Sequence, residues 1–465
     1  MPGNKKEFEC YENLVKESIR ELNDIMNVSF KEQVKDTIKS AMGRSVRSKD
    51  PMFWHAGMLM LGLSEARKNA GFDLKNKIDA AILDHLRLWR GKYGGRIDYV
   101  DDALAGAALL KIYEQCMKES ASHEEDTQDR NIVEPSEKDT QEKNKVGSYV
   151  EGAGEHNKSH AIANENHGRT NSPRIPELAD ECKNAADRIY KYLLQAPRDV
   201  AGTIVYNYGR SANVFADGVG QCSMFLSMYG KCFGDKKALE LAKVQLINFR
   251  KYGMDFRSGL PYHGYELITN AIAGSSNTVK IKHCVSDEQS KDSTESYSGD
   301  TPSKDEKKAL SADDAGQAGV IKKGVLSWGR AAGWLIMGLS EYVDAANKLQ
   351  YTDPENLTEW YGELTKTLLS YQRPGGGFSW QVQAVDGPLD TSATGMIMYG
   401  ILRGADELDA SAATLYDSID SSGRVQSALS SCDDFGVHYQ TYGHFPWGQG
   451  AALAALSAML LKDTE

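Results

Sequence analysis

The sequence lacks several patterns that would assign the protein to a familiar class. No stretch has the length and hydrophobicity of a membrane span, and residues 1–20 lack the apolar core of a signal peptide. The seven cysteines are scattered without a Cys-x-x-Cys pair, which argues against both a disulfide framework and a zinc site. We therefore expect a cytoplasmic protein with free thiols and no membrane partner.

Signatures of nucleic-acid binding and of several enzyme classes are also missing. The formal net charge is −11, and no block of lysine and arginine is long enough to follow a nucleic-acid backbone. A phosphate-binding Gly-x-x-x-x-Gly-Lys loop, a Gly-x-Ser-x-Gly turn and a His-Glu-x-x-His helix are absent. Nucleotide chemistry and a serine nucleophile are therefore disfavoured, and an acidic ligand would need a local cationic pocket.

Two stretches are too polar to join a folded core. Residues 120–174 and 275–318 consist mainly of Ser, Asp, Glu, Lys, Asn and His, with few aromatic or aliphatic residues. Such segments bury too little apolar surface to offset the entropy lost on ordering, so both are predicted to be disordered inserts. The remainder predicts a single domain over residues 1–465, interrupted by these two inserts.

Helical periodicity recurs along the rest of the chain, and no convincing alternating strand separates the helices. Some segments are charged on one face, whereas others, such as 103–110 and 450–456, are small and apolar nearly all round. This contrast predicts an all-α toroid, with an inner ring of buried helices and an outer ring of amphipathic helices in six or seven hairpins. An open helical solenoid is the alternative.

Six loops combine glycine with aromatic and ionisable residues, which are features of a binding site on a rigid scaffold. They are residues 94–101, 213–218, 259–265, 327–330, 375–380 and 444–450. Asp217, Asp101 and Asp102 lie directly ahead of apolar segments, where carboxylates also serve as simple helix caps. Carboxylates that head different inner helices can nevertheless converge at the mouth of a toroid, as cleavage of a glycosidic bond requires.

Further candidates suit a sugar ligand. His263 is flanked by Tyr262 and Tyr265, and Arg330 could hold a carboxylate through two parallel hydrogen bonds or could cap a helix. Tryptophan rings offer flat apolar faces on which the C–H faces of a sugar can stack. The tryptophans in or near the loops are Trp54, Trp328, Trp334, Trp380 and Trp447, of which Trp334 could equally belong to the core.

The chain resembles glycoside hydrolase family 105, the unsaturated rhamnogalacturonyl hydrolases, and the related family 88, the unsaturated glucuronyl hydrolases. The similarity covers most of the chain outside the inserts. Its most specific parts are Gly-Leu-Pro-Tyr-His-Gly at 259–264 and Trp-Gly-Arg-Ala-Ala-Gly-Trp at 328–334. Asp101 with Gly106, Asp217 after Phe215, Asp-Thr-Ser at 390–392 and Trp-Gly-Gln-Gly at 447–450 match further motifs of the family.

This resemblance implies a six-hairpin (α/α)6 toroid that removes a terminal 4,5-unsaturated uronic acid from lyase-generated oligosaccharides. It implies that Asp217 is the acid and then the base, that Asp101 is its partner, and that His263 contacts the sugar or water. Trp328 and Arg330 would form part of the substrate wall, and no metal or organic cofactor is implied. The partner would be a small acidic oligosaccharide, bound by a monomer or a homodimer.

Two departures from the family pattern concern the pocket. Gly220-Gln221 stands where the family often has Tyr-Met, and Ala331-Ala332 replaces Gly-Asn. The resemblance therefore does not determine which sugar forms the aglycone. Two alternatives to the hydrolase also remain: another toroid sugar enzyme, such as an inverting glycosidase or an epimerase, and a non-catalytic glycan-binding toroid.

Overall fold

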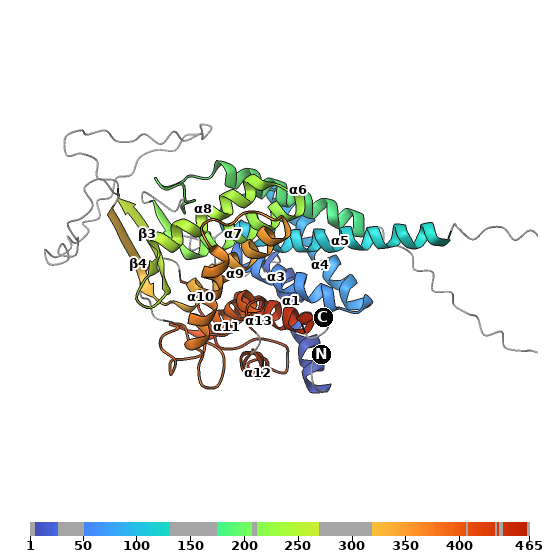
Figure 1. Cartoon of the computed structure of the whole chain (residues 1–465). Coiled ribbons are helices and arrows are strands. Elements are labelled where there is room, and N and C mark those ends of the chain that lie inside the picture. Colours follow the sequence, from blue (N-terminus) through green and yellow to red (C-terminus); the bar gives the residue numbers. More distant parts are fainter. Residues whose placement is uncertain are drawn as a thin grey trace, which may run out of the picture.

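The computed structural model describes residues 5–26, 51–130, 174–206, 212–268, 319–405, 408–432, 435–436 and 440–462. Within these residues the chain forms twelve α-helices and six short β-strands (Figure 1). None of the described helices combines the length and the hydrophobicity needed to cross a membrane.

Six of the helices form a closed inner ring. Each contacts the next in the order α3, α5, α7, α9, α11 and α13, and α13 returns to contact α3. These helices are buried on nearly all sides, as the small apolar segments predict. Their bounds are Trp54–Asn69 (α3), Asp102–Arg130 (α5), Ala216–Phe233 (α7), Gly329–Lys348 (α9), Thr391–Ile401 (α11) and Pro446–Lys462 (α13).

The other six helices pack outside this ring. α6, α8 and α10 contact α5, α7 and α9, while α1, α4 and α12 contact α3, α11 and α13. Their bounds are Lys5–Met26 (α1), Phe72–Tyr93 (α4), Arg174–Gln195 (α6), Lys236–Tyr252 (α8), Leu357–Ser370 (α10) and Asp409–Asp417 (α12). The predicted (α/α)6 toroid of six hairpins is confirmed, and the open solenoid is wrong because the ring closes.

Very close approaches hold neighbouring inner helices together. A Cβ atom added at Gly220 of α7 would lie 2.2 Å from the carbonyl oxygen of Trp334 in α9, and one at Gly338 would lie 2.6 Å from the carbonyl oxygen of Gly220. No larger residue fits at either position without moving a helix. Gly220, which stands where the family often has tyrosine, is thus a packing residue between α7 and α9.

Buried charges join the inner helices away from their N-terminal ends. Lys111 of α5 forms ion pairs with Glu341 of α9 at 2.9 Å and with Glu65 of α3 at 3.1 Å, and Tyr399 of α11 donates to Glu65 at 2.8 Å. Burial alone would lower the pKa of Lys111, but the two carboxylates raise it well above its usual value. Removing one member of such a network leaves an uncompensated buried charge, so the network fixes how the helices meet.

The expectation that no strands separate the helices is wrong. A small antiparallel sheet runs in the order β1-β3-β2, and β4 pairs with β3 (Figure 1). The strands are Asn213–Phe215 (β1), Met254–Asp255 (β2), Leu260–Ile268 (β3) and Gly319–Leu326 (β4), and a further pair joins Ala428–Leu429 (β5) to Tyr442–Gly443 (β6). Between these sheets α12 ends at Asp417, and the chain then forms a loop and β5.

The insert predictions fall mostly on residues that the structure does not describe. The first predicted insert begins too early, because α5 continues to Arg130 and α6 begins at Arg174. The rest of that segment, residues 131–173, lies outside the described residues, as do all of residues 275–318. The second segment connects β3 to β4, whose pairing spans it.

Candidate active site

Asp217 lies in the first turn of α7, with its carboxylate beside a histidine. The Oδ2 atom of Asp217 is 3.3 Å from Nε2 of His263, and the two side chains are 22% and 6% exposed. β1 leads directly into α7 and pairs with β3, which carries His263, so the sheet brings the two residues together. His263 therefore lies on a strand rather than in the expected loop, and a polar pair sits at the N-terminal end of an inner helix.

The two adjacent aspartates at the start of α5 have different surroundings. Asp102 is fully buried, and its Oδ2 accepts hydrogen bonds from the backbone N–H groups of Asp98 at 3.1 Å and Tyr99 at 3.3 Å. Asp101 instead accepts a hydrogen bond from the hydroxyl of Tyr206. Asp102 thus closes the loop before the helix, whereas Asp101 contacts the side chain of Tyr206.

Tyr206 lies between Asp101 and the first turn of α7. Its hydroxyl donates to Asp101, and a Cβ atom added at Gly218, next to Asp217, would lie 2.5 Å from its ring. Its ring also meets Phe215 edge to face, at 4.9 Å between centroids. The N-terminal ends of α5 and α7 therefore meet through this tyrosine, which sequence reasoning missed because residues 201–206 lie in a loop outside any motif.

A pocket opens beside His263. Of the expected sugar-binding residues, His263, Trp328 and Trp380 line it. Trp328 and His263 are in direct contact, at 4.2 Å between ring centroids. The other described lining residues are Val325, Leu429, Ser430, Ser431, Cys432, Phe435, Gly436 and Gln440. Aromatic faces and small hydroxyl groups together suit a sugar ring, which presents both C–H faces and hydroxyls.

Arg330 lies beneath this wall rather than at its surface. It is 2% exposed, and its guanidinium donates to the carbonyl oxygens of Leu429 and Ser430, each at 2.9 Å. It stacks 4.8 Å from the ring centroid of Trp328. Burial lowers the pKa of Arg330, although the carboxylates of Asp390 and Asp217 oppose this shift. These contacts favour a role in holding the pocket wall over the expected direct grip on a uronate.

The backbone of Leu429 receives a second set of contacts that reinforces this role. Its N–H donates to Asp390 Oδ1 at 3.1 Å, and its carbonyl oxygen also accepts from Trp447 Nε1 at 2.8 Å. Asp390 is fully buried and caps α11 through the N–H of Ser392. Residues 429–430 of the wall are therefore fixed from three inner helices, α9, α11 and α13.

The remaining expected tryptophans form a separate cluster. Trp54 at the start of α3 lies 4.9 Å from Trp447 and 6.4 Å from Trp334 between ring centroids. Trp334 and Trp447 are 2% and 6% exposed, whereas Trp54 is half-buried. None of these three lines the pocket described above, and Trp334 lies in the core, as its position within a helix allowed.

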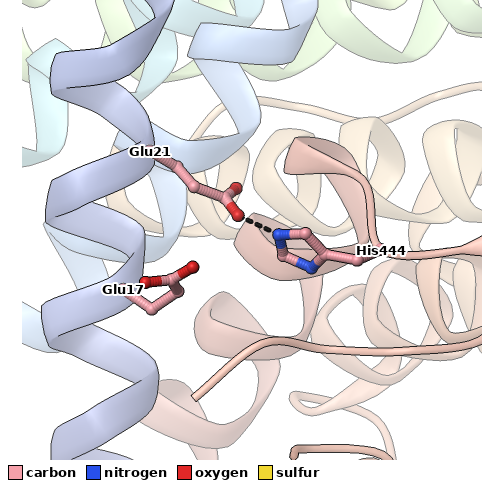
Figure 2. A group of neighbouring side chains, drawn as sticks. All are labelled: Glu17, Glu21 and His444. Carbon is pink, nitrogen blue, oxygen red and sulfur yellow. Dashed lines mark hydrogen bonds and ion pairs between the residues drawn. The ribbon is translucent and has the colours of Figure 1, made fainter. Parts of the chain in front are cut away.

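One further group of side chains has the spacing of a metal site. Glu17, Glu21 and His444 lie together, and Figure 2 shows Glu21 and His444 pointing toward one another. Both oxygens of Glu17, however, accept hydrogen bonds from Arg20, and Arg424 donates to it at 2.7 Å. Two guanidinium groups would repel a metal ion here, so the group fits an ion-pair network that ties α1 to the segment before α13.

The chain thus forms a closed double ring of helices, with acidic and aromatic side chains at the N-terminal ends of the inner helices. Residues 322–460 match the family model of Glycosyl Hydrolase Family 88. The chain is thus related to the glycoside hydrolases of families 88 and 105. No curated protein matches the sequence.

Solved structures agree in fold at low sequence identity. A possible member of family GH105 from Klebsiella pneumoniae superposes with a TM-score of 0.58 at 13% identity, covering 97% of this chain and 93% of that one. A possible family member from Salmonella enterica gives 0.55 at 14%, covering 88% and 83%. The unsaturated glucuronyl hydrolase of Bacillus sp. GL1 gives 0.51 at 13%, covering 88% and 87%.

Proposed function

We propose that the protein is a glycoside hydrolase that removes a terminal 4,5-unsaturated uronic acid from a small acidic oligosaccharide. The observation that carries the proposal is the Asp217–His263 pair at the head of α7, beside a pocket walled by Trp328 and Trp380. A similar solved structure is an unsaturated glucuronyl hydrolase that degrades glycosaminoglycan. The match of residues 322–460 to family 88 supports the same class of reaction.

The chemistry is hydration of an enol ether. Asp217 gives a proton to C4 of the unsaturated sugar, and positive charge develops on C5 and the ring oxygen. Water then adds at C5 and returns its proton to the Asp217 carboxylate, so that one residue serves as acid and then as base. The resulting hemiketal opens and releases the aglycone, and the overall reaction consumes one water.

The neighbours of Asp217 suit this role. His263 Nε2 lies 3.3 Å from Oδ2 of Asp217, where it can orient the carboxyl group or the attacking water. Oδ2 is buried and, within the described residues, has no hydrogen-bond partner beyond this contact. Asp101 heads the adjacent inner helix and is oriented by Tyr206, which suits a second carboxylate that positions the sugar.

The alternatives find less support in this pocket. An epimerase would need further histidines at the cavity, but among the described lining residues His263 is the one histidine. His444 is engaged by Glu21 and the carbonyl oxygen of Val425, and His438 lies outside the described residues. A purely glycan-binding toroid would not require the Asp217–His263 pair.

The experiment is turnover of two lyase-generated disaccharides, one with an unsaturated galacturonyl-rhamnose linkage and one with an unsaturated glucuronyl-hexosamine linkage. Hydration of the double bond removes the ultraviolet absorbance of the conjugated acid. Loss of absorbance with either substrate supports the proposal, and the ratio of kcat/KM values assigns the aglycone. Stable absorbance with both, in the presence of folded protein, would refute it.

A further inference from the structure

Phe435 has no place in the sequence motifs, yet its ring is built into the pocket. It is half-buried, lines the pocket and stacks on Phe215, with 4.0 Å between ring centroids and 5° between planes. Phe215 lies two residues before Asp217 at the start of α7. The ring of Phe435 is thus supported on one face by the residue that leads into the candidate acid.

Two glycines make the space that this ring occupies. A Cβ atom added at Gly264 of β3 would lie 2.7 Å from the ring of Phe435, and one at Gly324 of β4 would lie 3.2 Å from it. Gly324 also has a φ of +73°, which a residue with a side chain rarely adopts. Paired strands from distant parts of the chain therefore form a slot for a phenyl ring.

The ring also approaches the catalytic pair. Phe435 and His263 meet edge to face, with 5.1 Å between centroids and 78° between planes. His263 in turn contacts Asp217 and Trp328. The ring of Phe435 is therefore held by Phe215 and His263 while it remains part of the pocket lining and only half-buried.

We propose that Phe435 is a substrate-stacking residue, which binds the C–H face of the sugar next to the Asp217–His263 pair. The inference rests on the proposed function and adds a binding residue to that site. A phenyl ring carries no hydrogen-bonding group, so it selects the apolar face of a pyranose and leaves the carboxylate and hydroxyls directed elsewhere. The slot fixes the ring before substrate arrives, which limits the entropy lost on binding.

The test compares Phe435→Leu with Phe435→Tyr in the full-length chain. Leucine keeps apolar bulk without a flat face, whereas tyrosine keeps the ring. We expect Phe435→Leu to raise KM for the disaccharide about three- to tenfold and to change kcat less than about twofold, whereas Phe435→Tyr stays near wild type. Phe256→Leu is the matched control, because this phenylalanine is 78% exposed and does not line the pocket.

Two results would overturn the inference: an unchanged KM in Phe435→Leu, or equal damage in the leucine and tyrosine variants. Melting temperatures separate these outcomes from a loss of folding. If the wild type binds the disaccharide, by quenching of tryptophan fluorescence, but does not turn it over, the proposed reaction fails and the stacking role is judged from the Kd of the same variants. If the wild type does not bind it at all, both ideas fail.

Discussion

Replacing Asp217 with Asn tests the mechanism most directly. The amide has nearly the shape of the carboxyl group and can still contact His263, from which Asp217 Oδ2 is 3.3 Å away. It cannot, however, give a proton to C4 or accept one from water. Positioned acid–base catalysis contributes about 10²–10⁴-fold, and because one residue serves both halves of this reaction, we expect a loss near or above the upper end of that range.

The cost to stability should be much smaller. Asp217 lies in the first turn of α7, where a negative charge interacts favourably with the helix dipole by about 0.3–1 kcal/mol. Its side chain is 22% exposed, and its contact with His263 adds about 0.2–1 kcal/mol. A total of roughly 0.5–2 kcal/mol lowers Tm by a few degrees in a protein of this size, while the catalytic loss of about 10⁴-fold or more corresponds to about 5 kcal/mol or more.

The assay is initial-rate loss of ultraviolet absorbance, with circular dichroism to confirm the fold. Asp235→Asn is a matched control, because Asp235 caps the outer helix α8 through the N–H groups of Lys237 and Ala238. This change should cost little stability, because asparagine caps a helix about as well as aspartate, and it should leave turnover intact. A folded Asp217→Asn protein with near wild-type kcat would refute the assignment of the acid.

Three further predictions address neighbouring groups. Asp101→Asn should lower kcat/KM strongly, whereas Asp102→Asn should mainly lower Tm, because Asp102 holds the loop before α5. Steady-state kinetics and melting curves on both variants test this difference, and the reverse pattern would contradict it. Arg330→Lys should raise KM and lower Tm together, since lysine cannot reproduce both bonds to the pocket wall; a raised KM at unchanged Tm would instead indicate a direct grip on the uronate. Burial lowers the pKa of His444, but the hydrogen bond and charge of Glu21 outweigh burial and raise this pKa above its usual value. The His444–Glu21 pair therefore stabilises the fold by about 1 kcal/mol below about pH 6.5. This stabilisation is lost as pH rises through the pKa of His444 in the folded state. The Tm difference between wild type and His444→Gln should therefore shrink at alkaline pH, and a difference that grows with pH would show that the pair has been misread.

Much of the fold follows from helical periodicity, because a helix buried on every side needs neighbours all round. α7, α9 and α13 are apolar nearly throughout, which only an inner layer explains. The strands could not be recognised in the same way. β3 contains a proline near its start and a glycine in its middle, and its partner β4 follows only after residues 269–318. No local alternation therefore reveals the pair.

The sequence motifs identify some residues of the candidate site but not which of these residues touch one another. The sequence places Asp217 and His263 in separate motifs, and their contact depends on the pairing of β1 with β3. Tyr206 and Phe435 carry no motif at all. The glycines at 264 and 324 also allow the close approach of Val214 and His263, so they do not point to Phe435 in the sequence.

The proposed substrate is acidic, whereas the chain has a formal net charge of −11, so the proposal requires a local positive charge near the pocket. Among the described lining residues none is lysine or arginine, yet the Arg330 guanidinium lies 4.8 Å from the ring centroid of Trp328 in the pocket wall. A buried charge is screened less than one in water, so Arg330 can act on a bound carboxylate through the wall without touching it. The same residue would then fix the shape of the wall and supply the positive potential behind it. Arg330→Met removes both the bonds that shape the wall and the positive charge, whereas Arg330→Lys keeps the charge and loses only some of the bonds. The methionine variant should therefore show the larger rise in KM. Its KM should also depend less on salt concentration than that of the wild type.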